Sequence, residues 1–173
     1  MSMSSPPVDT AVQAVLRAER PQDGPRVDAL IERAFGPGRL AKAAERLREA
    51  NHPLTDISLV AWAGDEAVGC VRMWPVHIGG APAVLLGPFA VEDAWRSRGL
   101  GSELIAKACE AAQHAGYGLV LLVGDEPFFA KLGFATAPAG QVVLPGPVNA
   151  RRVLWRALKP GALEGVQGVV TAG

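Results

Sequence analysis

The pattern of apolar and polar residues predicts helices early in the chain and mostly strands after residue 55. Segments 26–36 and 38–50 repeat apolar residues at the spacing of an amphipathic helix, and Gly36 is the expected end of the first. The apolar positions are Val27, Leu30, Ile31 and Ala34 in the first segment, and Leu40, Ala43, Ala44 and Leu47 in the second. An apolar run over 11–19 predicts a strand before both helices.

From residue 56 the apolar runs are those of strands. Two runs within 56–76 flank Gly64-Asp65, a pair that favours a hairpin turn. Segments 81–91 and 117–125 are almost continuously apolar, which is typical of strands buried on both faces. A helix predicted over 99–115 separates them, so we expect a right-handed βαβ unit with parallel strands.

The remaining pattern predicts a short helix over 126–134 and strands near 141–144 and 151–158. The glycine-rich tail from residue 160 is expected to be a loosely held C-terminal extension, and the Ser/Pro-rich residues 1–9 to be disordered. No linker divides the chain. The sequence therefore predicts one α/β (α+β) domain over 10–159 with a mixed central sheet.

Composition and charge exclude several classes of function. Seventeen basic and 17 acidic residues cancel, so no global field favours nucleic acid or a membrane surface. The N-terminus lacks the pattern of a signal peptide, and the apolar runs are shorter than a membrane span. Cys70 and Cys109 lack metal-ligand spacing and are interpreted as small buried apolar residues in a reducing compartment. We expect a cytoplasmic protein that binds no metal.

The turn before the helix at residue 99 has the composition of an anion site. Gly99 and Gly101 allow the backbone to approach a ligand closely, and the first helical turn offers unpaired N–H groups. A phosphate suits such a helix start, where Arg96, Arg98 and Ser102 would add contacts. A plain tight turn with solvated arginines is the alternative. A dinucleotide fingerprint is excluded because Leu104 stands where the third glycine belongs.

These residues resemble a known family. Arg96-x-x-Gly99-x-Gly101 is similar to the pyrophosphate motif Gln/Arg-x-x-Gly-x-Gly/Ala of the GNAT superfamily of acetyl-CoA-dependent N-acetyltransferases. The resemblance includes "LLGPFAV" before the loop and "LVLLVGD" and "FFAKLGF" after it, and covers roughly residues 10 to 165. It is closest to a bacterial subgroup of predicted acetyltransferases with "LGPLAV" and "GDPAYYxRFGF" at these places, which often continue with a "PGAL-x-G" stretch, as 160–165 does here.

The resemblance implies a GNAT-like fold, with a mixed six- to seven-stranded sheet, about four helices and splayed parallel central strands. Gly87-Pro88 interrupts the strand 81–91, and because proline cannot donate to a strand ladder, a bulge or splay is expected there. By resemblance, the backbone of 89–91 would pair with pantetheine, the loop 96–102 would hold the pyrophosphate, and Phe129 would pack on the cofactor. The implied cofactor residues are Phe89, Ala90, Val91, Arg96, Ser97, Arg98, Gly99, Leu100, Gly101, Ser102 and Phe129.

The chain departs from the family at the residue that many members use as an acid. They carry a tyrosine four residues before the glycine of the "LGF" segment, whereas this chain has Phe129 there and Phe128 beside it. The only tyrosine, Tyr117, lies outside the motif. A phenyl ring cannot donate a proton to the leaving thiolate of CoA. Two options remain: the thiolate leaves without an acid, or water protonates it.

Candidates for a proton acceptor are few. His77 is the catalytic candidate, with Glu92 and Asp93 as further options, while Trp74 could line an acceptor pocket or simply pack. A covalent route through Cys109 also remains open.

We predict an N-acetyltransferase that transfers an acetyl group from acetyl-CoA to an amine of a small molecule or protein by direct attack. The alternative is an acyl-CoA-binding module with little or no transfer activity, which the missing tyrosine favours. We expect neither nucleic acid nor membrane as a partner, and the oligomeric state, a homodimer being one option, stays open.

Overall fold

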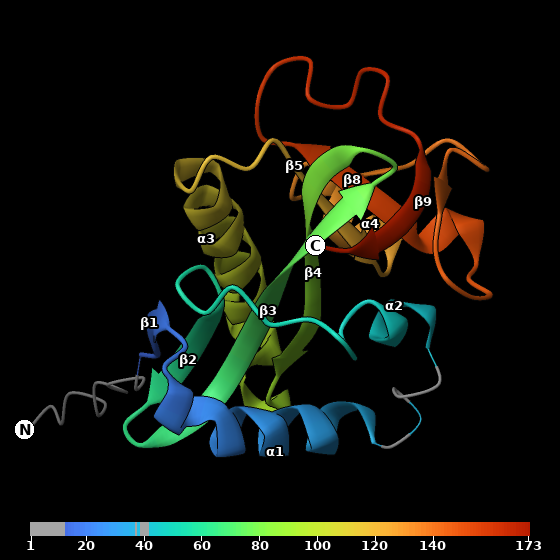
Figure 1. Ribbon diagram of the computed structural model, residues 1–173. Coiled ribbons are helices and arrows are strands. Elements are labelled where there is room, and N and C mark those ends of the chain that lie inside the picture. The colour runs from blue at the N-terminus through green and yellow to red at the C-terminus, as the bar shows by residue number, and fades with distance from the viewer. Residues whose placement is uncertain (1–12, 37, 39–41) are drawn as a thin grey trace, which may run out of the picture.

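The computed structural model describes residues 13–36, 38 and 42–173. A mixed sheet forms its centre, and helices pack on both faces (Figure 1). The strands are β1 (Val15–Ala18), β2 (Leu59–Ala63), β3 (Glu66–Ile78), β4 (Ala81–Val91), β5 (Leu119–Val123), β6 (Ala135–Thr136), β7 (Val142–Val143), β8 (Val153–Ala157) and β9 (Gly168–Ala172). The helices are α1 (Gly24–Phe35), α2 (Ala43–Arg46), α3 (Leu100–His114) and α4 (Glu126–Ala130), with 3-10 turns η1 (Pro21–Asp23), η3 (Asp93–Arg98) and η4 (Ala150–Arg152).

The sheet has the strand order β1-β2-β3-β4-β5-β8-β6, with β9 added at β3 and β7 at β9. Neighbours are antiparallel except for the pairs β4–β5 and β7–β9. The parallel pair β4–β5 is connected through α3, so the predicted βαβ unit is confirmed. The hairpin between β2 and β3 is also as predicted, and its turn contains Gly64 at φ 61°.

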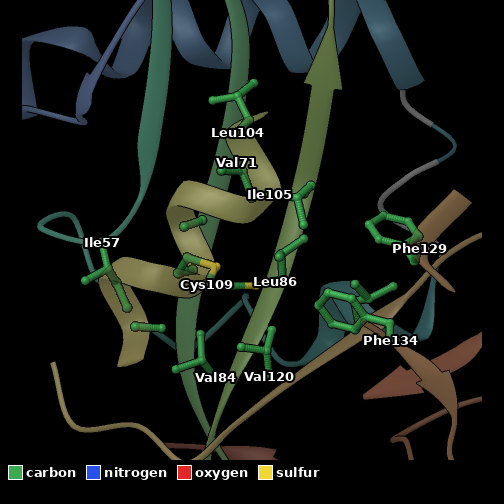
Figure 2. Close-up of a cluster of buried hydrophobic side chains, with 14 of the residues drawn as sticks. Ile57, Val71, Val84, Leu86, Leu104, Ile105, Cys109, Val120, Phe129 and Phe134 are labelled. Atoms are coloured by element: carbon green, nitrogen blue, oxygen red, sulfur yellow. The ribbon is translucent and has the colours of Figure 1, made fainter. Parts of the chain in front are cut away.

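Side chains of alternate residues along the central strands fill two cores. On one face, Leu104, Ile105 and Cys109 of α3 pack against β3, β4 and β5, and Phe129 and Phe134 extend the same cluster (Figure 2). On the other face, α1 and α2 pack through separate apolar clusters. Both faces of β4 are thereby buried, which explains why its sequence is an almost continuous apolar run.

The first part of the chain follows the predicted order with shorter elements. Helix α1 ends as expected at Gly36, where φ is 65° and the N–H donates to the carbonyl of Glu32 at 2.9 Å. The first strand covers Val15–Ala18 of the predicted 11–19, and residues 11 and 12 lie outside the described residues. The second helix is reduced to Ala43–Arg46, and Leu40 of its predicted apolar face is not among the described residues.

The prediction of a loosely held tail is wrong for its last part. Residues Gly168–Ala172 form β9, which pairs antiparallel with the end of β3 and parallel with β7. Gly79 and Gly168 let the two backbones meet, because a Cβ on Gly79 would lie 2.3 Å from the carbonyl oxygen of Gln167. With β9 and the two-residue strands β6 and β7, nine strands are described where six or seven were expected.

The central strands separate at the point where the sequence predicts a bulge. Strands β4 and β5 pair only at Val84–Val120 and Leu85–Leu121 within the described residues. Against β3, Leu86 lies opposite Met73 and Phe89 opposite Val71, so the two residues Gly87 and Pro88 face one residue of β3. Their extra length is a β-bulge. The indole Nε1 of Trp74, on β3, donates a hydrogen bond to the Gly87 carbonyl at 2.6 Å and so stabilises the bulge.

The buried thiol of Cys70 is predicted to make the fold less stable at high pH. Burial raises the pKa of its thiol from 9.0 to about 12, although Arg72 acts in the opposite direction. At a pH between these two pKa values, the Cys70 thiol is deprotonated in the unfolded chain but still protonated in the folded protein. The free energy of unfolding should therefore fall as pH rises. We expect a loss of about 1 kcal/mol at pH 10 relative to pH 8, measured by urea denaturation. The Cys70→Ala variant should show a smaller fall, and an identical fall would contradict the assignment.

Candidate active site

A cleft of about 680 Å³ opens where β4 and β5 separate. Its floor is apolar and consists of residues that are themselves largely buried: Leu86, Ala90, Val91, Leu122 and Phe129. Beyond Leu85 the backbone of β4 turns away from β5, so the edge of β4 facing the cleft keeps polar groups that β5 does not pair. The arrangement can accept an extended, partly apolar ligand that forms hydrogen bonds with the backbone.

Aromatic rings form one wall of the cleft. Phe128 stacks on Phe89 with ring centroids 6.1 Å apart and meets Phe129 edge-on at 4.9 Å. Phe129 packs in turn on Phe134 at 5.7 Å and is 7% exposed, whereas Phe128 is 38% exposed. Gly124 makes room for this cluster, since a Cβ there would lie 2.6 Å from Cε2 of Phe129. The wall therefore offers a hydrophobic surface and no proton donor.

The N-terminus of α3 lies at the edge of the same cleft. Gly99 takes a left-handed conformation at φ 76° and starts the helix, and no side-chain cap is described for its first N–H groups. Gly101 lines the cleft, and a Cβ at this position would be 3.0 Å from Cζ of Phe89. Unpaired N–H groups and the helix dipole make this end of the cleft suited to an anion.

The arginines of the predicted loop have different positions. Arg96 lines the cleft; its Nε contacts the Val91 carbonyl at 3.3 Å and an Asp93 carboxylate oxygen at 3.2 Å. The guanidinium of Arg98 lies over the Trp95 ring at 4.5 Å. The predicted cofactor residues that line the cleft are Phe89, Ala90, Val91, Arg96, Gly101 and Phe129. Those that do not are Ser97, Arg98, Gly99, Leu100 and Ser102, with the Leu100 side chain packed in the core.

The opposite side of the cleft contains charged residues that the sequence analysis missed. Arg48, which follows α2, is 13% exposed at its side chain and pairs with Glu45 at 3.1 Å. A Cβ on Gly87 would lie 2.8 Å from Nη2 of Arg48, so the Arg48 guanidinium lies directly over the bulge.

Arg152 of η4 and Asp125 line the cleft as well, and Nη2 of Arg152 lies 3.6 Å from Oδ1 of Asp125. The sequence carried weak signals for this side in the basic pair Arg151-Arg152 and in Asp125, which follows β5. The spacing of apolar residues gave no indication that they lie close together.

Comparison with known proteins decides the family. Residues 55–136 match the acetyltransferase (GNAT) domain family. The chain is 31% identical over 159 residues to the uncharacterized N-acetyltransferase YhbS of Escherichia coli K12, covering 90% of this chain and 94% of that protein. This chain is a GNAT N-acetyltransferase. The resemblance found in the sequence is therefore confirmed.

Solved GNAT structures resemble most of the chain. The crystal structure of YhbS from Escherichia coli in complex with CoA has a TM-score of 0.81 at 30% identity and covers 96% of this chain and 93% of its own. A GNAT acetyltransferase from Brucella melitensis in complex with acetyl-CoA has a TM-score of 0.70 at 27% identity, covering 94% and 97%. The GNAT fold predicted from the sequence is confirmed.

The structure does not bring His77 to the cleft of this GNAT protein. β3 carries it past the separation point to its hairpin end, where it is paired between Pro82 of β4 and Thr171 of β9. Nor does Trp74 line the cleft: it is 8% exposed and packs in the core. His77 therefore lies outside the cleft, and its role as a proton acceptor stays a prediction that this position does not support.

The other chemical candidates also lie outside the cleft. Glu92 pairs with Arg33 of α1, and Asp93 is almost fully exposed beside Arg96. Burial raises the pKa of the Cys109 thiol, which is 1% exposed on the core-facing side of α3. A covalent route through Cys109 therefore has no geometric support.

Two features are absent from residues 13–36, 38 and 42–173. None of the helices in these ranges has the length and apolar character needed to cross a membrane. No three side chains of His, Cys, Asp or Glu in the same ranges are grouped so that they could hold a metal ion.

Proposed function

We propose that this GNAT protein binds acetyl-CoA in the cleft between β4 and β5 and transfers the acetyl group to an amine of a small molecule or protein. The observation that carries the proposal is the separation of the two parallel strands beside the uncapped N-terminus of α3. The crystal structures of two related proteins, one in complex with CoA and one with acetyl-CoA, support the same ligand.

The described residues suit the parts of this substrate. The edge of β4 at residues 89–91 offers backbone groups for the amides of pantetheine, and the aromatic wall offers a surface for its methylenes. Gly101 leaves room for a phosphate close to the first turn of α3, where Arg96 would add a charge-assisted hydrogen bond. These are proposed roles for residues that the cleft brings together.

Transfer begins when the nitrogen of a neutral amine attacks the thioester carbonyl carbon. The new C–N bond forms, the C–S bond breaks, and CoA leaves as a thiolate while the amine loses a proton to solvent. Phe128 and Phe129 cannot protonate the leaving group, but a thiol pKa of about 8.5 makes the thiolate a tolerable leaving group. We therefore propose that the chain itself acts by orienting the reactants and excluding water from the apolar floor.

Arg96→Ala should weaken the binding of acetyl-CoA by about 1–3 kcal/mol, because a charge-assisted hydrogen bond to phosphate is lost. Isothermal titration calorimetry measures the affinity directly. Arg26→Ala is the matched control, since Arg26 is exposed on α1, donates to the Asp65 carbonyl and does not line the cleft. Equal affinities of the two variants would mean that Arg96 makes no contact with the ligand.

Two measurements test the proposed function. No binding of acetyl-CoA at high micromolar concentration would overturn it. A thiol-release assay with a panel of amines then separates transfer from binding alone. Tight binding with no release from any amine would favour the alternative of an acyl-CoA-binding module, which the phenylalanine at position 129 supports.

A further inference from the structure

We propose that the amine acceptor carries a carboxylate, which binds the basic side of the cleft formed by Lys42, Arg48 and Arg152. This inference rests on the proposed function, because it assigns the side of the cleft opposite Arg96 to the acceptor. The three residues come from segments far apart in the sequence: Lys42 and Arg48 flank α2, and Arg152 ends η4. We name this group the acceptor-side cations.

The acceptor-side cations are separate from the anion site at α3. Ala43 of α2 lies beside the loop that follows β7, since a Cβ on Gly146 would be 3.4 Å from the Ala43 Cβ. Ala43, Leu47 and Val148 share one apolar cluster, so α2 and the segment leading to Arg152 form a continuous wall. Arg96 and Gly101 belong to η3 and α3. The pyrophosphate loop therefore does not account for cations on this wall.

More basic than acidic side chains line the cleft. Among the described residues that line it, Asp125 is the only acidic one, against the three acceptor-side cations and Arg96. Glu45 balances the charge of Arg48 and Asp93 that of Arg96, so Lys42 and Arg152 are the cations that matter for an incoming ligand. Asp125 is 80% exposed at its side chain and 3.6 Å from Arg152, a separation typical of a weak surface pair. The positive charge of Lys42 and Arg152 favours an acceptor with an anionic group and disfavours a polyamine.

Arg152 has the geometry to bind a carboxylate. Its side chain is 48% exposed, and its Nε reaches the Gly124 carbonyl only at 3.4 Å. Short charge-assisted bonds from the guanidinium to an incoming carboxylate would therefore replace long contacts. Arg48 lies deeper, over Gly87, where its ion pair with Glu45 holds the guanidinium at the inner end of the cleft.

The size of the site limits the acceptor to a compact molecule. The cleft holds about 680 Å³ in total, and part of this volume is assigned to the pantetheine arm. The surroundings of the acceptor-side cations are apolar, with Phe35, Ala43 and Val148 among them. A carboxylate bound to Arg152, with an amine directed toward the bulge at Gly87, is the arrangement that this wall favours.

The test compares amino acids with their primary amides as acceptors in the thiol-release assay. Amidation removes the negative charge at nearly constant size. It also lowers the pKa of the amine, which favours the amide chemically, so a preference for the free acid must come from binding. We expect kcat/KM to be at least tenfold higher for the best amino acid than for its amide, and spermidine to react poorly. Equal rates for acid and amide, or a preference for spermidine, would overturn the inference.

Arg152→Gln should raise the KM for the amino acid about tenfold or more and leave kcat within twofold. The KM for the amide and the affinity for acetyl-CoA should stay unchanged. Arg151→Gln is the matched control, because Arg151 is the exposed neighbour that does not line the cleft. If both variants discriminate acid from amide like the parent protein, Arg152 does not bind the acceptor and the inference fails.

The assay separates failure of this inference from failure of the proposed function. Acetylation of neutral amines without a preference for carboxylates would leave the proposed function intact and overturn only the inference. Release of no thiol with any acceptor, despite binding of acetyl-CoA, would overturn both.

Discussion

Replacing Gly101 with valine should reduce the affinity for acetyl-CoA by more than a hundredfold. A Cβ at this position would lie 3.0 Å from the Phe89 ring and 3.8 Å from the Phe128 ring, so the added methyl groups have no space on that side. They would project into the cleft that Gly101 lines, beside the first N–H groups of α3. A phosphate could then no longer reach those groups, and isothermal titration calorimetry would measure the loss.

The control must separate this steric effect from a general effect of a β-branched residue in α3. Ala106→Val introduces the same side chain into the same helix at an exposed position outside the cleft. It should bind acetyl-CoA like the parent protein, and both variants should retain their helix content in circular dichroism. Binding by Gly101→Val within threefold of the parent would show that the phosphate groups do not use this helix start.

The anion site at α3 could be predicted from the sequence because its parts are adjacent in the chain. Gly99 and Gly101 have a local backbone role, and the apolar face of the following helix fixes where the first N–H groups are unpaired. The bulge at Gly87-Pro88 was predictable for the same reason, since proline disrupts a strand ladder wherever it occurs.

The acceptor side could not be predicted in this way. Arg48 and Arg152 are separated by about a hundred residues, and only the packing of α2 against the loop after β7 brings them to one wall. The position of His77 outside the cleft could not be predicted for a related reason. A strand pattern gives the face of each residue but not its position along the strand relative to a cleft, and β3 extends well past the separation of β4 and β5.

The C-terminal strand shows a second limit of sequence patterns. A high glycine content is typical of loops, but at Gly79 and Gly168 it permits a close approach of two backbones. Strand β9 pairs with β3 through contacts between residues nearly a hundred positions apart, so local propensity carries no signal of the pairing.

Leu104→Ala should lower the free energy of unfolding by about 2–5 kcal/mol, because a fully buried side chain is replaced by a cavity. Leu104 fills the notch left by the missing side chain of Gly69, where a Cβ would lie 2.8 Å from Cδ1 of Leu104. The contact joins α3 to β3 and so fixes the helix whose first turn is proposed to hold phosphate. Urea denaturation of the apo protein measures the change.

Lys107→Ala, on the exposed face of the same helix, should change the free energy of unfolding by less than about 0.5 kcal/mol. If Leu104→Ala also lowered the free energy of unfolding by only about 0.5 kcal/mol, the contact between Leu104 and Gly69 would not hold α3 on the sheet. Because acetyl-CoA binds only the folded protein in the proposed function, its addition at about 100 times the dissociation constant should stabilise the Lys107→Ala variant by about 2.7 kcal/mol. A smaller gain for Leu104→Ala at the same concentration would show that the packing of α3 also positions its first turn for the ligand.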